Sequence, residues 1–246
     1  MTRYILTESD LRSIIRESIK EQLGTLNEAA DSFFSSKGLD DKFNRLVSQG
    51  WSLKAIFSAM RDYCDRHLGL PDGEGSSRVA YQIDDNRVLK LAKNKKGLAQ
   101  NKAEAACYMR STSNNDLFPK IFDTSDNGLW IDCEFVLPAK GSDFLECTNY
   151  DWDEFIEIVS DLSNYSKLSP DNYYKKWLDK LVKTDYFIAE LFQYIVKDGA
   201  PSGDVQRIEN WGMTNRNGTP RMVLLDSGLT WAILKDFYWR PTSSSY

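Results

Sequence analysis

A lysine within an apolar strand is the first residue whose setting suggests chemistry. Lys90 stands in the run RVLKLA, where its neighbours favour burial, and a buried ammonium group requires an anionic partner. Glu104, in the later stretch GLAQNKAEAACYMRS, is a candidate for that partner. Considered without their surroundings, the two residues would instead be a solvated strand lysine and a carboxylate on a helix surface.

A glycine-rich turn precedes this strand and is suited to phosphate binding. The stretch DGEGSSR places Gly73, Gly75 and Ser76 before the first of two β-type runs. Glycine has no side chain to hold a phosphate away, so the backbone N–H groups of such a turn can approach it closely. A simple glycine-containing hairpin is the alternative interpretation.

A small antiparallel sheet with one helix is the expected framework around these residues. Three β-type runs, SSRVAYQI, RVLKLA and LWIDCEFVL, alternate with turn residues at 84–86 and 126–128. The segment between the second and third runs is rich in Ala, Gln, Lys and Glu, which predicts a helix. That helix would carry Glu104 close to the strand of Lys90.

Helical segments are expected before this sheet. Residues 7–23 have apolar side chains at helical spacing behind Thr7, a suitable N-cap, and predict an amphipathic helix. A second helical region covers residues 39–68 and is interrupted at Gly50.

The chain after Pro138 is predicted to be mainly helical and to end in a hairpin. Three stretches, DWDEFIEIVSDLSNY, SPDNYYKKWLDKLV and TDYFIAELFQYIVKDG, have helical patterns, and Gly199 ends the last of them. A β-type pair follows, NWGMT and PRMVLLD, joined by Asn217-Gly218, which is a strong hairpin signal.

The order of these motifs resembles that of a protein-kinase-like fold. GEGSSRVAY resembles the glycine-rich loop, RVLKLA the strand with the phosphate-pairing lysine, and QNKAEAACY the helix with its glutamate. LWIDCEFVLPA resembles the strand and hinge that receive adenine. GDVQRIENWG resembles the catalytic loop, and VLLDSGL the strand and turn whose aspartate holds magnesium. The resemblance extends over about residues 70 to 230.

The resemblance implies a role for each matching residue. Lys90 would pair with the phosphates of ATP, Glu104 would orient Lys90, and Asp204 would accept a hydroxyl proton. Asn210 and Asp226 would ligate magnesium, an ion that prefers such oxygen atoms. The implied nucleotide-binding positions are Gly73, Gly75, Ser76, Lys90 and backbone groups from Glu134 to Val136.

The sequence departs from the kinase pattern at several positions. Arg78 replaces the third glycine of the loop, where its charge would meet phosphate or solvent. Asp204 lies six residues before Asn210 instead of five and lacks the usual preceding histidine and arginine, so either the loop contains a one-residue bulge or Asp204 only hydrogen-bonds the loop. Only 20 residues follow Asp226, too few for an activation segment and the usual late helices. These differences favour a minimal atypical kinase, a small-molecule kinase or a nucleotide-binding module without catalysis.

The expected fold class is α+β with two kinase-like lobes. An amphipathic arm (1–24) and a helical extension (25–70) would precede an N-lobe with a small antiparallel sheet (71–138) and a truncated, mainly helical C-lobe (139–246). The stretch TESDLRSIIRESIKEQL resembles the openings of proteins from large tailed phages. It would bind a protein partner in the phage particle or the host, or pack on its own domain.

Composition and charge exclude several classes of partner. The 246 residues carry a net charge of −5 without a Lys/Arg block, which argues against nucleic acid. No apolar run approaches the roughly 20 residues of a membrane helix, and the N-terminus lacks the apolar core of a secretory signal. We therefore expect a soluble protein of the cytoplasm or, if the protein is phage-encoded, of the host cytoplasm or the virion.

The cysteines and the single histidine suggest no catalytic or metal site. The four cysteines, Cys64, Cys107, Cys133 and Cys147, lack the paired spacing of a zinc site and are expected to be buried, reduced thiols. His67 stands at an expected helix end, where a structural or solvated role is predicted.

Three functional hypotheses follow from the sequence. The first is an ATP- and magnesium-dependent phosphotransferase with an unknown acceptor, because phosphoryl transfer requires charge neutralisation and alignment more than a covalent nucleophile. The second is transfer of AMP by the same fold, with the nucleotide bound in the reverse orientation. The third is a pseudokinase or virion-associated interaction protein that uses the fold as a scaffold.

Overall fold

The chain is an α+β protein that forms two compact units, Met1–Pro71 and Asp72–Tyr246. The computed structural model describes residues 34, 36–110 and 117–239. The sheets are antiparallel, which confirms the α+β class and the sheet type expected from the sequence. The predicted amphipathic helix in residues 1–24 lies outside the described residues.

Two helices make up the described part of the first unit. They are α2 (Ser36–Ser48) and α3 (Leu53–Leu68). The break predicted at Gly50 is confirmed, because this residue has a φ of +76°, a left-handed conformation that favours glycine. Ser52 then caps α3 by accepting a hydrogen bond from the backbone N–H of Ala55. His67 lies in the last turn of α3, as expected.

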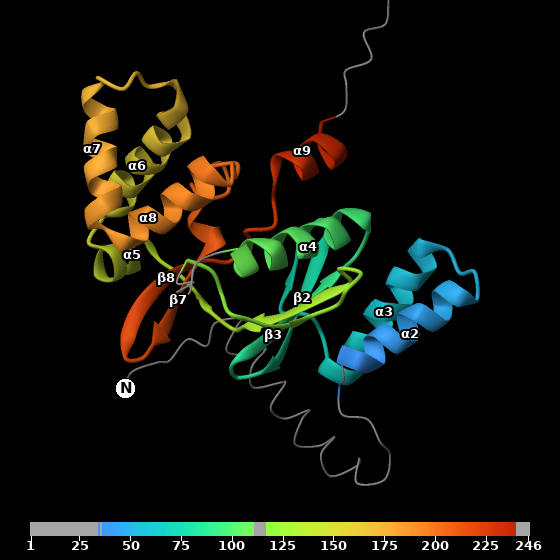
Figure 1. Ribbon diagram of the computed structural model, residues 1–246. Coiled ribbons are helices and arrows are strands. Elements are labelled where there is room, and N and C mark those ends of the chain that lie inside the picture. Colours follow the sequence, from blue (N-terminus) through green and yellow to red (C-terminus); the bar gives the residue numbers. More distant parts are fainter. Residues whose placement is uncertain (1–33, 35, 111–116, 240–246) are drawn as a thin grey trace, which may run out of the picture. The chain divides into compact units, whose positions relative to one another are not determined.

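The second unit begins with a five-stranded antiparallel sheet in the order β1-β2-β3-β5-β4. The strands are β1 (Gly73–Glu74), β2 (Arg78–Asp84), β3 (Arg87–Ala92), β4 (Ile121–Thr124) and β5 (Trp130–Glu134). The predicted helix is α4 (Lys95–Arg110), which packs against β3 and β5 (Figure 1). Lys90 lies in the central strand, opposite Ala80 of β2 and Ile131 of β5. The lysine therefore has a neighbouring strand on each side, which limits its access to water.

A three-stranded antiparallel sheet follows later in the chain, in the order β6-β7-β8. Its strands are β6 (Leu137–Pro138), β7 (Trp211–Arg216) and β8 (Thr219–Leu224). The hairpin predicted at Asn217-Gly218 is confirmed, because both residues have positive φ angles, 56° and 81°. Two consecutive residues with positive φ are typical of the type I′ turn that joins twisted strands.

Four helices, α5 (Gly141–Thr148), α6 (Trp152–Asn164), α7 (Tyr173–Thr184) and α8 (Tyr186–Phe192), enclose an aromatic core around Trp211. The last helix, α9 (Trp231–Phe237), packs against α4, and short helical turns lie at Tyr165–Lys167, Gln193–Lys197 and Ile208–Asn210. The Trp211 ring is fully buried and contacts the rings of Phe144, Phe155 and Phe187. Its indole N–H donates to the carbonyl of Val205 at 2.8 Å, so the tryptophan holds the loop before β7 in place.

The cysteines are free thiols, as the sequence predicts. Cys64, Cys107 and Cys133 are buried, and Cys147 is half-buried. Burial raises the pKa of the Cys133 thiol to about 11, so this side chain stays protonated at neutral pH. None of the helices in the described part of the chain combines the length and the apolar character that a membrane span requires.

Candidate active site

A buried ion pair joins the central strand to the helix packed on the sheet. The Nζ atom of Lys90 on β3 lies 2.5 Å from a carboxylate oxygen of Glu104 on α4. The side chains are only 14% and 5% exposed, respectively. The strand lysine and the helix glutamate that the sequence predicted to pair are therefore in direct contact. The alternative, in which both side chains are exposed to solvent, is wrong.

Arg78 on β2 connects this ion pair to Asp226, the residue that follows β8 by two positions. One guanidinium nitrogen lies 2.5 Å from the second oxygen of Glu104, and another lies 2.5 Å from the carboxylate of Asp226. The Arg78 side chain is only 11% exposed. Its charge thus meets carboxylates within the protein, whereas the sequence suggested phosphate or solvent.

Asp204, Asn210 and Asp226 are brought together by the hairpin of β7 and β8. The backbone N–H of Leu225 donates to the carbonyl of Asn210 at 2.7 Å, which places Asp226 next to that residue. The Asn210 side-chain amide donates to the carbonyl of Asp204 at 2.9 Å. Lys90 reaches the same place, because its Nζ donates to the carbonyl of Leu225 at 2.6 Å. Residues from three distant parts of the chain therefore converge at the end of β8.

The charges of this cluster shift the pKa values of its members. Burial is the largest effect and lowers the pKa of Lys90, but the attraction of Glu104 and Cys133 and the hydrogen bond to Glu104 together outweigh it, so the pKa lies above the ordinary value. For Asp226, burial raises the pKa and the cations Arg78 and Lys90 lower it more, which leaves it below the ordinary value. Asp204 is the opposite case, since burial and then the charge of Asp226 raise its pKa. At neutral pH the lysine is a cation and Asp226 is an anion.

Two buried polar residues of α4 support the cluster and were not predicted from the sequence. The Asn101 amide donates to the carbonyls of Gly128 and Lys90 at 3.0 and 3.3 Å, and its oxygen accepts from Arg78. Gln100 accepts a hydrogen bond from the Ser77 hydroxyl. The signal was present in QNKAE, where the amides precede Glu104 by three and four positions and therefore share one side of a helix.

The glycine-rich turn is anchored to the connection between β3 and α4. Gly75 donates to the carbonyl of Arg78 at 2.9 Å, and Gly73 pairs with Ala80 in the sheet. The hydroxyl of Ser76 accepts from Lys96 at 2.7 Å. All three predicted phosphate-binding residues are exposed, with a lysine at the turn.

The close approach of α4 to this turn depends on Gly97. A Cβ atom at this position would lie 2.2 Å from the carbonyl oxygen of Ser77 and 3.0 Å from Ala92, distances that backbone atoms cannot accommodate. The helix can therefore pack against the turn only with glycine at this position.

The predicted hinge residues are engaged in contacts within the protein. The N–H groups of Glu134 and Phe135 donate to the carbonyls of Lys120 and Asn86, both at 2.8 Å. The Glu134 side chain accepts from Thr214 at 2.6 Å and from Arg216 at 2.9 Å, both on β7. Glu134 therefore links the two sheets, a structural role that the sequence did not suggest.

Val136 is the other predicted hinge residue, and it packs in the interior. Its side chain is buried. A Cβ atom added at Gly212 would lie 2.6 Å from the Cγ1 atom of Val136, so the backbone of β7 packs closely against this side chain. The predicted adenine-binding segment thus lies where β5 passes into β6 and meets the second sheet.

Comparison with known proteins adds no assignment to this geometry. No protein-family model matches the sequence, and no curated protein matches it.

Proposed function

We propose that this protein is an ATP- and magnesium-dependent phosphotransferase of kinase-like fold, with an acceptor still to be identified. The observation that carries the proposal is the buried ion pair of Lys90 and Glu104 beside Asp226. A lysine that is held charged and positioned by a carboxylate is suited to neutralise the phosphates of a nucleotide. The order of the five-stranded sheet and its helix supports the same fold, since the lysine strand and the glutamate helix follow the glycine-rich turn as the kinase pattern requires.

Asp226 and Asn210 have the oxygen atoms that a nucleotide-bound magnesium ion prefers. Magnesium usually retains several waters and takes one or two protein ligands together with phosphate oxygens. Within residues 34, 36–110 and 117–239, no group of three or more His, Cys, Asp or Glu side chains is arranged to hold a metal ion. The Asn210 amide nitrogen points to Asp204, so its carbonyl oxygen remains for a ligand. When bound, the ion would supply charge neutralisation at the phosphates.

Asp204 is the residue that would accept the proton of a hydroxyl acceptor. Its side chain is half-buried, and its raised pKa makes the carboxylate a better proton acceptor than an ordinary aspartate. The hydrogen bond from Asn210 to its carbonyl orients the loop. This contact supports Asp204 as the base although the spacing to Asn210 is one residue longer than in the kinase pattern.

The position of Arg78 favours a second candidate function, that of a catalytically inactive scaffold. Its guanidinium binds both Glu104 and Asp226, so a positive charge already lies beside the predicted metal ligand. Under this alternative, Arg78 stays bound to Glu104 and Asp226 and excludes a magnesium ion from Asp226. The protein then acts by binding a protein partner, for which residues 1–24 are the predicted contact.

Calorimetric titration of ATP into the wild-type protein and Arg78→Met tests the proposal. Magnesium must draw Asp226 away from Arg78, whereas methionine fills similar volume without competing for the carboxylate. We expect magnesium-dependent ATP binding by the wild type. Binding by the variant should be about tenfold tighter, because a charged hydrogen bond contributes on the order of 1.5 kcal/mol.

Arg61→Met is the matched control, since this arginine pairs with Asp65 in the other unit. It should leave ATP binding unchanged. Weaker binding by Arg78→Met would mean that Arg78 itself holds the nucleotide. No ATP binding by either protein would refute the proposal and support the scaffold.

A further inference from the structure

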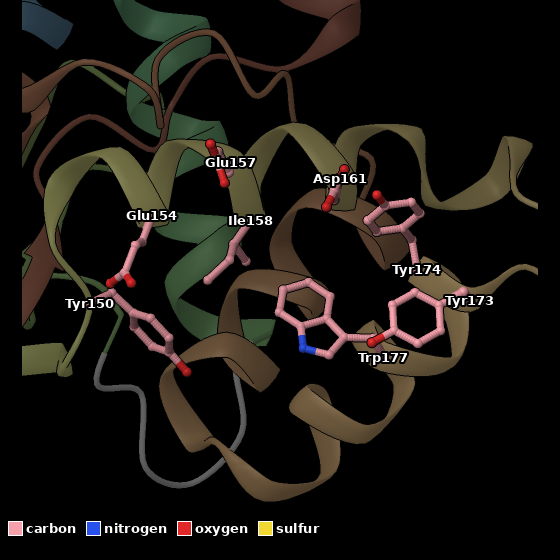
Figure 2. Close-up of a pocket in the computed structure, with 8 residues that line it drawn as sticks. All are labelled: Tyr150, Glu154, Glu157, Ile158, Asp161, Tyr173, Tyr174 and Trp177. Carbon is pink, nitrogen blue, oxygen red and sulfur yellow. The ribbon is translucent and has the colours of Figure 1, made fainter.

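A cavity with aromatic walls lies between α6 and α7, apart from the cluster around Lys90. Its volume is about 360 Å³, within the range of small-molecule sites. Tyr150, Tyr173, Tyr174 and Trp177 form its aromatic lining, and Glu154, Glu157 and Asp161 add three carboxylates. Figure 2 shows the acidic residues along α6 and the rings of Tyr173, Tyr174 and Trp177 on α7, with Tyr150 near Glu154.

The aromatic residues of α7 are exposed to a degree that core packing does not explain. Tyr173, Tyr174 and Trp177 are 76%, 59% and 37% exposed, whereas Leu178 on the same helix is fully buried. Large aromatic side chains bury most of their surface when they serve the core. These three therefore present their rings to the cavity or to solvent instead of packing in the core.

The carboxylates of α6 give the cavity a net negative charge. Glu154 uses one oxygen to accept the backbone N–H of Asp151, as part of the helix cap. Glu157 and Asp161 form no ion pair or hydrogen bond with any side chain that the structure describes. Nearby lysines of α7 point elsewhere, since Lys175 donates to the carbonyl of Leu168 and Lys176 pairs with Asp171.

We propose that this cavity binds an elongated organic polyamine. Cations are attracted to the faces of tryptophan and tyrosine rings, and amine groups donate to carboxylates. The aromatic rings and the carboxylates of the cavity together therefore favour a cation that also has apolar segments. The acidic residues follow one another at intervals of three and four positions, which separates them by roughly 4.5 and 6 Å along the helix axis. A chain of amines joined by short alkyl linkers matches this linear arrangement, and no group of three or more His, Cys, Asp or Glu side chains in the described part of the chain could hold a metal ion. The inference does not depend on the proposed phosphotransferase activity.

Titration of spermidine into the full-length protein at low ionic strength tests the inference. We expect saturable one-to-one binding that weakens as salt is added. Trp177→Ala and Asp161→Asn should each weaken it by about fivefold or more, because each removes one of the two kinds of cation contact. Asp161→Asn keeps the size of the side chain and the wall of the cavity, so it tests the charge even if the tryptophan variant does not fold.

Two exposed residues outside the cavity provide matched controls. Trp231→Ala, on α9, and Glu146→Gln, on α5, should leave spermidine binding unchanged. The inference would be overturned if spermidine did not bind, or if the controls weakened binding as much as the cavity variants. Equally tight binding of tetramethylammonium, or of magnesium in a manner that Asp161→Asn weakens, would overturn the polyamine assignment. Tighter binding of a lysine-rich peptide would assign the cavity to a protein partner instead.

Discussion

The variant Glu104→Gln is expected to lose about 3–5 kcal/mol of its free energy of unfolding. Each oxygen of the Glu104 carboxylate lies 2.5 Å from a cation, one from Lys90 and the other from Arg78. Glutamine has the same size, but it has no charge, and its amide group would face one of the two cations as a second donor. Lys90 would then lose its carboxylate partner and retain the carbonyl of Leu225, while Arg78 would retain Asp226. Urea denaturation at pH 7 measures the loss.

An exposed glutamate supplies the control for this variant. Glu146→Gln on α5 should change the free energy of unfolding by no more than about 0.5 kcal/mol. Adding Arg78→Met to Glu104→Gln should recover part of the loss, because it removes one of the two cations that faced the Glu104 carboxylate. A loss below about 1 kcal/mol for Glu104→Gln would contradict the buried cluster.

The variant Lys90→Ala is expected to bind ATP about a hundredfold more weakly than the wild type, because a buried charge that faces phosphates contributes on the order of 2–3 kcal/mol. The fold should persist, because Arg78 continues to pair with Glu104. Isothermal calorimetry with magnesium measures the affinity, and thermal unfolding verifies that the variant is folded.

Lys102→Ala is the control for the lysine variant, since Lys102 is an exposed lysine on the same helix as Glu104. Its ATP affinity should equal that of the wild type. If Lys90→Ala bound ATP as tightly as the wild type, the nucleotide would lie elsewhere and the role assigned to Lys90 would be wrong.

Local sequence signals predicted the elements of the fold well. Gly50 marks the break between two helices because only glycine adopts its backbone conformation without cost, and Asn217-Gly218 marks a hairpin for the same reason. The pairing of Lys90 with Glu104 followed from the need of a buried lysine for an anion. These features depend on neighbouring residues, so a single sequence is sufficient to find them.

The partners of Arg78 could not be predicted because they depend on strand register. Lys90 lies opposite Ala80, and side chains two residues apart share one face of a strand, so Arg78 and Lys90 point to the same side. A shift of one residue would turn Arg78 to the other face, and the sequence does not specify the register. Asp226 lies 148 residues after Arg78 in the chain, so their contact depends on how distant elements pack together.

The role of Glu134 was missed for a related reason. Its partners Thr214 and Arg216 are on β7, about eighty residues later. The sequence around Glu134 indicates only the end of a strand, and this is the position at which the kinase pattern has a hinge. A contact between two sheets has no local signal, since it depends on how the sheets pack.

Release of phosphate from ATP labelled at the γ position tests the central claim most directly. We predict magnesium-dependent release of inorganic phosphate, or its transfer to an acceptor, by the wild type and a large loss in Asp204→Asn. Because Asp204 must be deprotonated to accept a proton and its pKa is raised above 3.8, the rate should fall as the pH decreases through that raised value. Release of pyrophosphate would indicate transfer of AMP instead. Magnesium-dependent ATP binding without release of either product, or with equal release by Asp204→Asn, would contradict the account.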